Sequence, residues 1–357
     1  MNKVEQEINL QHIRCKNRLI RSAVHSFLGN PDGTMTAAEF DMYETLAKND
    51  VGMIITGHCH VSPLGQANEE QIAIYDDQYI KQFGEAAAKV HPYGAKFVVQ
   101  ISHAGPRAIH NEDLADVVER EMKKNHHARE LTLAEIASIR QQFIEAAKRL
   151  QKAGVDGIQI HAAHSYLLSR FIDATFNQRT DEYGGSIENR FRLCAEIIEG
   201  IKAACGEDFP VFVKINNDSK TEDEAYGQDM VYMLKQCRLL GVELVECSGV
   251  DFISMERTAT LYYLDRVAAL RKEVDIPLSL VGGVRSLADM EAVLAAGIDM
   301  VSLGRPLICE PDIFKKLLSG EQEKSQCMSC NRCFALPHIK PGLRCVFQRK
   351  LKKKKED

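Results

Sequence analysis

Two histidines and a tyrosine lie close together in the segment His161-Ala-Ala-His164-Ser-Tyr166, directly after an apolar run. Imidazoles three residues apart can converge on one ligand oxygen. A tyrosine with an ordinary pKa of ~10 stays protonated at neutral pH and can donate a proton. The same histidines could instead bind Zn²⁺ or form a structural pair satisfied by hydrogen bonds. The spacing leaves these three interpretations open.

Glycines end two other apolar runs. Gly282 and Gly283 follow Val281, and Gly304 precedes Arg305. A ligand anion can approach backbone N–H groups closely at glycine, and arginine can add a charge-assisted pair. Tight turns would also use glycine, but two such loops with an arginine favour a phosphate-binding site.

Two polar residues end further apolar runs, Gln100 after Phe97-Val98-Val99 and Lys214 after Val211-Phe212-Val213. A glutamine amide both donates and accepts, as the edge of a pyrimidine ring requires. A lysine at a strand end can stabilise developing negative charge. Each residue could also be a solvated strand end or an ion-pair partner.

Four of the 11 cysteines form the pattern Cys327-x₂-Cys330-x₂-Cys333-x₁₁-Cys345. Four thiolates suit zinc or an iron–sulfur cluster, and the first three have the ferredoxin spacing. The clustering favours a metal centre over a set of reduced thiols in a surface extension. The other cysteines are scattered and are expected to be small buried hydrophobes.

Short apolar runs alternate with longer helical patterns along the chain. The runs are continuously apolar, as in Met53-Ile54-Ile55, which is typical of parallel strands buried on both faces. Eight strand–helix pairs without a G-x-G-x-x-G turn predict an α/β fold of the (β/α)₈ TIM-barrel type rather than an open doubly wound sheet. The predicted strands are Leu19–Ala23, Gly52–Thr56, Lys96–Ile101, Gly157–His161, Val211–Ile215, Leu244–Cys247, Leu278–Val281 and Met300–Leu303. The predicted helices are Ala37–Lys48, Gln78–Val90, a helix from Thr132 to a stop at Gly154, a helix after Ser186, Asp223–Leu240, Leu264–Glu273, Leu287–Ala295 and Asp312–Leu318.

The barrel is expected to span residues 1–320, followed by a Cys-rich C-terminal extension and basic tail at 321–357. Barrels build their sites from the loops after the strands, and bind phosphate with the last two of them. This places the glycine loops at a phosphate site. It also predicts that the long, polar segment Gly105–Ala128 is an active-site loop.

The composition excludes several classes of protein. The 357 residues carry a net charge of -5, which argues against nucleic-acid binding, and the basic run Lys350–Lys354 is expected to be a solvated tail. Hydrophobic residues make up 45%, yet no run is long enough to cross a bilayer and the N-terminus lacks a signal-peptide pattern. We therefore expect a cytoplasmic protein that does not bind membranes.

Taken together, these motifs resemble the Old Yellow Enzyme family of FMN oxidoreductases from about Asn17 to Asp312. The resemblance is carried by five strings: Lys16-Asn17-Arg18-Leu19-Ile20, Gln100-Ile101-Ser102-His103-Ala104-Gly105, Ala153-Gly154 through His161-Ala-Ala-His164 to Tyr166-Leu167-Leu168, Asn177 to Ser186 with Glu188-Asn189-Arg190, and Ser302-Leu303-Gly304-Arg305-Pro306.

The resemblance implies a role for each matching position. Gln100 would bind the pyrimidine edge of FMN, and Lys214 would face flavin N1. His161 and His164 would hold the substrate's carbonyl oxygen or the nicotinamide, and Tyr166 would be the proton donor. The flavin ring would be lined by Ser22, Ala23, His25 and His58, and the phosphate held by Gly282, Gly283, Gly304 and Arg305.

The family also implies a reaction. Hydride would pass from NAD(P)H through flavin N5 to the β-carbon of an α,β-unsaturated carbonyl compound, while Tyr166 protonates the α-carbon. The expected partners are NAD(P)H and a small-molecule substrate, with a homo-oligomer possible. Two alternatives remain: a flavin and iron–sulfur electron carrier for a separate reductase chain, and a metal-dependent barrel enzyme.

The cysteine pattern resembles that of the subgroup containing 2,4-dienoyl-CoA reductase and trimethylamine dehydrogenase, where a cluster connects the barrel to a second flavin domain. The sequence ends soon after Cys345, so no such domain is expected, and the spacing between Cys330 and Cys333 is one residue shorter than in that subgroup. His25 and His58 also replace smaller or less basic residues of the best-known alkene reductases, which indicates a different substrate.

Overall fold

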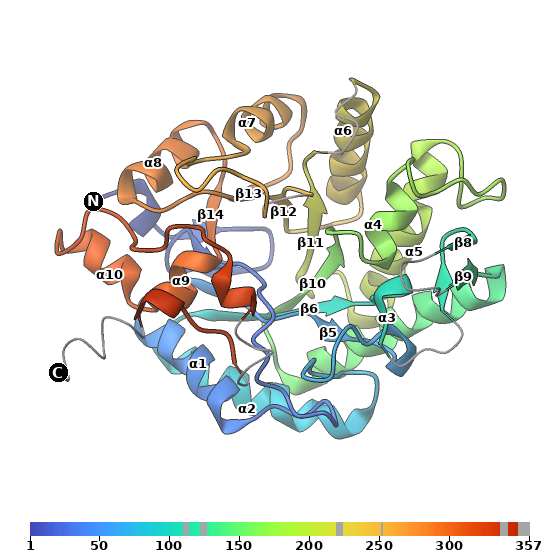
Figure 1. Cartoon of the computed structure of the whole chain (residues 1–357), viewed down its shortest axis with the longest axis horizontal. Helices are drawn as coiled ribbons and strands as arrows, with labels where there is room; N and C mark the ends of the chain where they lie inside the picture. The colour runs from blue at the N-terminus through green and yellow to red at the C-terminus, as the bar shows by residue number, and fades with distance from the viewer. Residues whose placement is uncertain (110–113, 122–126, 219–223, 251–252, 336–341, 349–357) are drawn as a thin grey trace.

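Eight parallel strands form a closed barrel in the computed structural model (Figure 1). The structure describes residues 1–109, 114–121, 127–218, 224–250, 253–335 and 342–348. Pairing between the fourth and third strands closes the ring, and the (β/α)₈ prediction is confirmed. The strands are β3 (Leu19–Arg21), β4 (Met53–Ile55), β6 (Lys96–Ser102), β10 (Gly157–Ala162), β11 (Val211–Asn216), β12 (Leu244–Ser248), β13 (Leu278–Val281) and β14 (Met300–Leu303).

Helices surround this barrel, as Figure 1 shows. They are α1 (Ala37–Lys48), α2 (Ile80–Val90), α3 (Leu133–Ala153), α4 (Leu167–Ile172), α5 (Ile187–Cys205), α6 (Glu224–Leu239), α7 (Leu264–Glu273), α8 (Leu287–Ala295), α9 (Arg305–Cys309) and α10 (Ile313–Leu318). The short helices α4 and α9 were not predicted, and the predicted start of α6 at Asp223 lies outside the described residues. Single 3₁₀ turns occur at Lys3–Glu5, Pro63–Gly65, Asp77–Tyr79, His91–Tyr93, Gly105–Arg107 and Arg332–Ala335. Within the described ranges, no helix is both long and apolar enough to span a bilayer.

Local sequence signals fix the ends of α3. The Thr132 hydroxyl accepts from the backbone N–H of Glu135, and the Glu135 carboxylate accepts from the N–H of Thr132, which forms the predicted capping box. At the other end Gly154 adopts a left-handed backbone, φ 78°, which a side chain would disfavour. Capping therefore specifies where this helix starts and stops.

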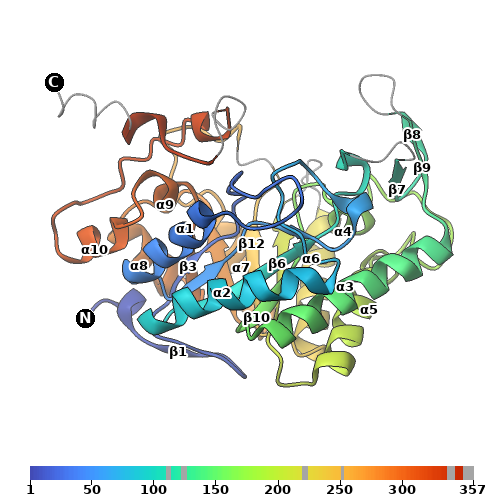
Figure 2. The ribbon, with the colours of Figure 1, turned by 90° about the horizontal axis from the view of Figure 1, so that it is seen from below.

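A small hairpin closes one end of the barrel. Strands β1 (Ile8–Asn9) and β2 (Arg14–Cys15) pair antiparallel, and β1 lies below the barrel in Figure 2. Ile8, Leu10 and Ile13 pack there with buried side chains from the strands, among them Phe212. This apolar plug seals the N-terminal ends of the strands, so ligands are left with the opposite face.

The segment Gly105–Ala128, which the sequence predicted to be an active-site loop, includes regular secondary structure. It contains β7 (Ala115–Asp116) and β8 (Arg120–Glu121), which both pair with β9 (His127–Glu130) to form a small outlying sheet (Figure 2). Residues 110–113 and 122–126 lie outside the described residues. Local pairing to β9 orders the described part of this segment.

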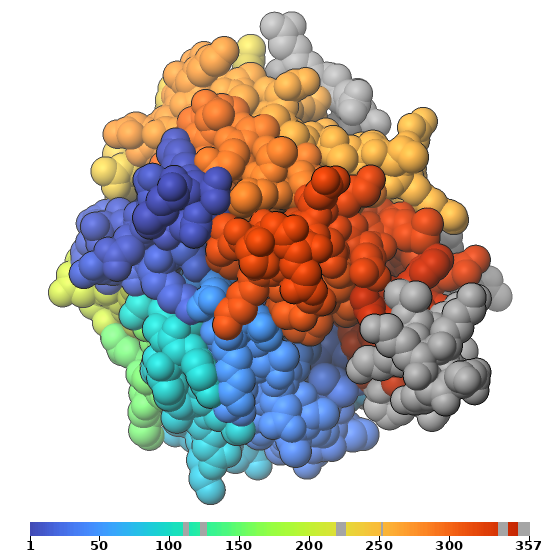
Figure 3. All heavy atoms as spheres, turned by 90° about the vertical axis from the view of Figure 1, so that its left-hand side faces the viewer, coloured from blue at the N-terminus to red at the C-terminus, as the bar shows by residue number. Residues whose placement is uncertain are grey.

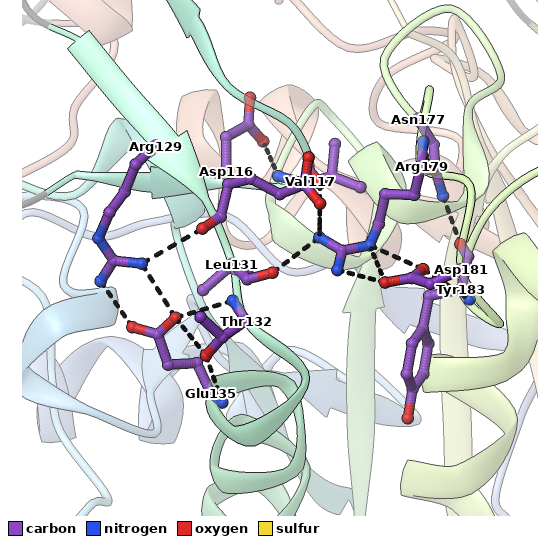
Figure 4. A network of polar contacts seen from close by, with 11 residues as sticks. Asp116, Val117, Arg129, Leu131, Thr132, Glu135, Asn177, Arg179, Asp181 and Tyr183 are labelled. Carbon is purple, nitrogen blue, oxygen red and sulfur yellow. Dashed lines mark hydrogen bonds and ion pairs between the residues drawn. The ribbon is translucent and has the colours of Figure 1, made fainter.

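A polar network fastens that sheet to the barrel (Figure 4). Arg179 donates to the carbonyl oxygens of Val117 and Leu131, each at 2.8 Å, and pairs with Asp181 at 2.6 Å. Arg170 binds buried Asp116 through two hydrogen bonds. The string Asn177–Ser186, which carried much of the family resemblance, therefore has a structural role here.

The chain after β14 covers one side of the barrel. On the face shown in Figure 3, its orange-to-red residues lie next to the blue N-terminal third. Lys315 donates to the carbonyl of Lys48 at 2.7 Å, and the N–H groups of Gly342 and Leu343 donate to Phe27 and Ser26, each at 2.7 Å. The first bond joins α10 to the end of α1, and the other two tie the extension to the loop that follows β3.

Candidate active site

A cavity of about 510 Å³ opens at the carboxyl ends of the barrel strands, the face that carries sites in this fold. Its volume is within the range of cofactor and substrate pockets. The lining includes every residue that the sequence predicted for catalysis or cofactor binding: Ser22, Ala23, His25, His58, Gln100, His161, His164, Tyr166, Lys214, Gly282, Gly283, Gly304 and Arg305.

A buried chain of polar side chains lies under one wall of this cavity. Lys214 donates to Ser22 Oγ at 2.8 Å and pairs with Glu246 at 3.1 Å, and both side chains are buried. Burial alone would raise the pKa of Glu246, but Lys214 and hydrogen bonds from Ser22, Ser302 and Gln159 hold it below its ordinary value. Glu246 is thus a carboxylate at neutral pH, and Lys214 keeps one N–H available for a ligand.

The same carboxylate fixes the orientation of two amides. A carboxylate can only accept, so Gln159, 3.1 Å from Glu246, must present Nε2 to it. Gln159 Oε1 then faces Gln100 and accepts from Gln100 Nε2 at 2.7 Å. Gln100 is left with one N–H and its carbonyl oxygen, one donor and one acceptor, for a ligand in the cavity.

The histidine pair lies at the other end of the cavity. The rings of His161 and His164 are 5.4 Å apart, and that of Tyr166 is 4.7 Å from His161. Among the described atoms, the buried His161 Nδ1 has no hydrogen-bond partner. His164 Nε2 is 2.9 Å from Ser248 Oγ. Because His161 lines the cavity, a buried ring nitrogen without a partner marks this residue as a candidate ligand contact.

The backbone at His164 and Ser165, between the first histidine and Tyr166, has an unusual conformation. His164 and Ser165 both have φ 59°, which is unusual for residues other than glycine. Asn216 Oδ1 accepts from the N–H of His164 at 3.1 Å, and Arg107 donates to its carbonyl at 3.1 Å. Strained backbone that is held on both sides is common at functional sites.

Burial keeps these groups neutral. It lowers the pKa of His161 well below its ordinary value, with help from His164 and His58, and lowers the pKa of His164 to about 3. It lowers the pKa of His25 to about 4 although Asn68 bonds to that ring. Burial also raises the pKa of Tyr166 to about 12, against the influence of Arg107. The site therefore offers neutral N–H and O–H donors at neutral pH.

Close packing around Gly282 and Gly283 leaves no space for a side chain, so these glycines are needed whether or not a phosphate binds there. Gly283 has φ 75°, and a Cβ there would lie 2.5 Å from the backbone N of Leu261. A Cβ on Gly282 would lie 2.7 Å from Tyr263. Arg305 donates to Asn331 Oδ1 at 2.6 Å and so also contacts the C-terminal segment.

The four clustered cysteines line one smaller cavity of about 20 Å³ next to the first. Cys309 lines it too, although its place in the sequence gave no signal, and Arg305 borders both cavities. Burial raises the pKa of Cys333 to about 11. Within the described residues, no three His, Cys, Asp or Glu side chains are positioned to share one metal ion, and this holds for the cysteines and for the His161–His164 pair.

Sequence reasoning missed Glu246, Gln159, Arg107 and Gln71 as parts of the site or its support. Glu246 had a detectable signal, because a single charge inside the apolar strand Leu244–Ser248 calls for a buried partner. In the barrel it is paired in register with Lys214.

Comparison with known proteins agrees with this geometry. Residues 6–324 match the model of the NADH:flavin oxidoreductase / NADH oxidase family. An NADH oxidase of Thermoanaerobacter brockii is 34% identical over 88% of this chain and 51% of its own length. An NADPH dehydrogenase of Geobacillus thermodenitrificans is 33% identical over 83% of this chain and 88% of its own.

Two further matches are longer proteins. A cinnamate reductase of Clostridium sporogenes is 30% identical over 90% of this chain and 54% of its own length. The solved structure of a 2-naphthoyl-CoA reductase complex has a TM-score of 0.89 at 22% identity, over 96% of this chain and 56% of that one. The chain thus spans about half the length of some relatives and nearly all of others.

Proposed function

Because the chain belongs to the NADH:flavin oxidoreductase / NADH oxidase family and is therefore an enzyme of the flavin oxidoreductase class, we propose that it reduces an α,β-unsaturated carbonyl compound with NAD(P)H and FMN. The observation that carries the proposal is the single cavity that gathers all 13 residues expected from the sequence. The names of the relatives, NADPH dehydrogenase and cinnamate reductase, support the choice of reductant and substrate class.

The donors and acceptors of the cavity fit FMN. Gln100 offers one donor and one acceptor to the pyrimidine edge, and the remaining N–H of Lys214 can bind flavin N1. The backbone of Gly282 and Gly283 and the guanidinium of Arg305 would hold the phosphate. Gly304 would also contact the phosphate, and Ser22, Ala23, His25 and His58 would line the flavin ring. The bound flavin supplies hydride transfer between NAD(P)H and the substrate.

The residues of the chain then act on the substrate. His161 and His164 are neutral and can donate to its carbonyl oxygen, which stabilises the negative charge that develops there. Tyr166 gives its proton to the α-carbon, and the phenolate regains a proton from water. In the net reaction NAD(P)H loses a hydride, and the C=C bond gains that hydride and one proton.

We also propose that Cys327, Cys330, Cys333 and Cys345 bind an iron–sulfur cluster. Support comes from their spacing and from the cavity that all four line beside Arg305. Each thiolate of a cubane cluster binds a different iron, so such a cluster does not require four sulfur atoms around one ion. Zinc does require this geometry, since it binds sulfur at ~2.3 Å.

The remaining assignments from the sequence stay predictions. These are a barrel domain over residues 1–320 with a Cys-rich extension over 321–357, a cytoplasmic location, and a possible homo-oligomer. The basic run Lys350–Lys354 lies outside the described residues.

Two measurements test the proposal. The cofactor released by heat is expected to be FMN by chromatography, and finding FAD or no flavin would refute the assignment. Steady oxidation of NAD(P)H by an enone, with no second protein present, is expected for a reductase. Flavin reduction without turnover would favour the electron-carrier alternative.

A further inference from the structure

His58 lies beside Tyr166 at the histidine end of the cavity. Its Nε2 is 3.3 Å from Tyr166 Oη, and the ring centroids are 5.1 Å apart. Either atom could be the donor of this hydrogen bond, and the direction of the bond decides whether the tyrosine proton is available to a substrate. If Tyr166 donates to His58, its acidic proton is engaged; if His58 donates, the proton of Tyr166 can point to a substrate.

Gln71 decides between these possibilities. Its side chain is fully buried, and its Oε1 is 2.6 Å from the backbone N of Ala67, which can only donate. Its Nε2 is 3.1 Å from the backbone carbonyl of His58, which can only accept. A flipped amide would place donor against donor and acceptor against acceptor, so two backbone groups fix the orientation of Gln71.

The orientation of Gln71 in turn fixes the tautomer of His58. Gln71 Nε2 is a donor and lies 2.6 Å from His58 Nδ1, which must therefore accept and carry no proton. Burial, together with the nearby His25, His60 and His164, lowers the pKa of His58 well below its ordinary value, which excludes the doubly protonated ring at neutral pH. The single ring proton is on Nε2, the atom that faces Tyr166.

We propose that His58 is a positioning residue for the proton donor. Its Nε2–H donates to Tyr166 Oη, which leaves the tyrosine O–H directed at the substrate. Hydrogen bonds from Ala67 through Gln71 and His58 thus connect a partly buried backbone N–H to the tyrosine that donates the proton. The proposal rests on the reductase function proposed above.

His58 acts on the phenolate rather than by passing a proton. When Tyr166 protonates the α-carbon, its O–H bond breaks and the negative charge stays on Oη. The N–H of His58 then makes a charge-assisted hydrogen bond to that oxygen, which is stronger than the bond to the neutral phenol. Surrendering this proton would leave an imidazolate, so the phenolate is reprotonated by water.

Nitrogen NMR of the purified protein tests the tautomer without any turnover. With ¹⁵N-labelled histidine and the His58→Gln variant for assignment, we expect Nδ1 unprotonated and Nε2 protonated at neutral pH. A proton on Nδ1, alone or together with one on Nε2, overturns the proposal. This result is independent of whether the substrate class is correct.

A second test reverses the tautomer from outside the cavity. In Gln71→Glu the carboxylate accepts from His58 Nδ1–H, so Nε2 becomes an acceptor and takes the proton of Tyr166. Losing the bond to the phenolate should slow substrate reduction by roughly 10- to 100-fold, with flavin reduction by NAD(P)H nearly unchanged. NMR should show the reversed tautomer in the same sample.

Gln82→Glu is the matched control. Gln82 is also buried and accepts from a backbone N–H, that of Met35 at 2.7 Å, but its Nε2 donates to the carbonyls of Gly33 and Ala73 and not to a histidine. It should leave the tautomer of His58 and both half-reactions unchanged. A reversed tautomer in Gln71→Glu without a slower substrate step would overturn the role of His58. Absence of enone reduction in the wild type would instead contradict the proposed function.

Discussion

Replacing Glu246 with glutamine should reveal how strongly the buried pair with Lys214 stabilises the barrel. The two groups are 3.1 Å apart, with side-chain exposures of 3% for Lys214 and 0% for Glu246. At an effective dielectric constant of ~20 their attraction is about 5 kcal/mol. Removing one partner of a buried pair typically costs about 3–5 kcal/mol, because the other charge is left uncompensated. We therefore expect Glu246→Gln to lower the free energy of unfolding by about 3–5 kcal/mol.

This cost can be converted into a melting temperature. With an unfolding entropy of roughly 2.1 cal/mol/K per residue, the 357 residues give about 0.75 kcal/mol/K, so Tm should fall by roughly 4–7 °C. Calorimetry at equal flavin content measures this. The pKa of Glu246 is lowered in the fold, so its contribution is present above the ordinary pKa of 4.5 and is lost as pH falls through the lowered folded value. Wild type and variant should therefore converge at acidic pH.

Glu39→Gln is the control for this experiment. Glu39 is equally buried, but its described hydrogen bonds come from neutral hydroxyls, Ser26 at 3.0 Å and Tyr43 at 2.8 Å, and burial raises its pKa. Neutralising it removes no ion pair, so the change should stay below about 1 kcal/mol. Equal losses in the two variants would refute the ion-pair argument and indicate a general cost of changing a buried carboxylate.

Three further predictions follow from the site. Tyr166→Phe should slow substrate reduction by ~10²–10⁴-fold in stopped-flow measurements and leave flavin reduction by NAD(P)H nearly intact; equal losses would mean a structural role. Arg107→Gln should raise KM for a carboxylate substrate such as cinnamate more than KM for a neutral enone. Arg107 lines the cavity, and its guanidinium carbon is 6.0 Å from the ring centroid of Tyr166, so its charge is close to the bound substrate. Equal changes in KM for the two substrates would exclude charge recognition. Anaerobically purified protein should contain iron and sulfide near ~4 each per chain; zinc near one per chain, or no metal, would contradict the cluster.

The sequence alone determined the architecture and the location of the site. Continuous apolar runs such as Val211-Phe212-Val213 specify strands buried on both faces, and all eight strands lie within two residues of their predicted ends. Capping residues such as Thr132 and Gly154 fixed helix ends for the same local reason. Because sites on barrels lie at the carboxyl ends of strands, Gln100, His161 and Lys214 could be assigned to one cavity before any contact was known.

Composition was a poor guide where pairing between short strands and contacts from other segments decide the structure. The segment Gly105–Ala128 has the composition of a loop, yet β7 and β8 pair with β9. Arg179, from a segment distant in sequence, donates to the carbonyl of Val117, which directly follows β7. The spacing of four cysteines likewise gave no hint that Cys309 would line the same cavity.

The protonation states of the buried site residues are set by the tertiary structure. A histidine in a sequence has two tautomers and an ordinary pKa, and only burial together with the amide of Gln71 places the proton of His58 on Nε2. Glu246 is likewise a carboxylate because β11 and β12 pair in a register that places it beside Lys214. Hydrogen bonding and desolvation act over a few ångströms between residues far apart in the chain, so only the closed barrel could bring these partners within reach.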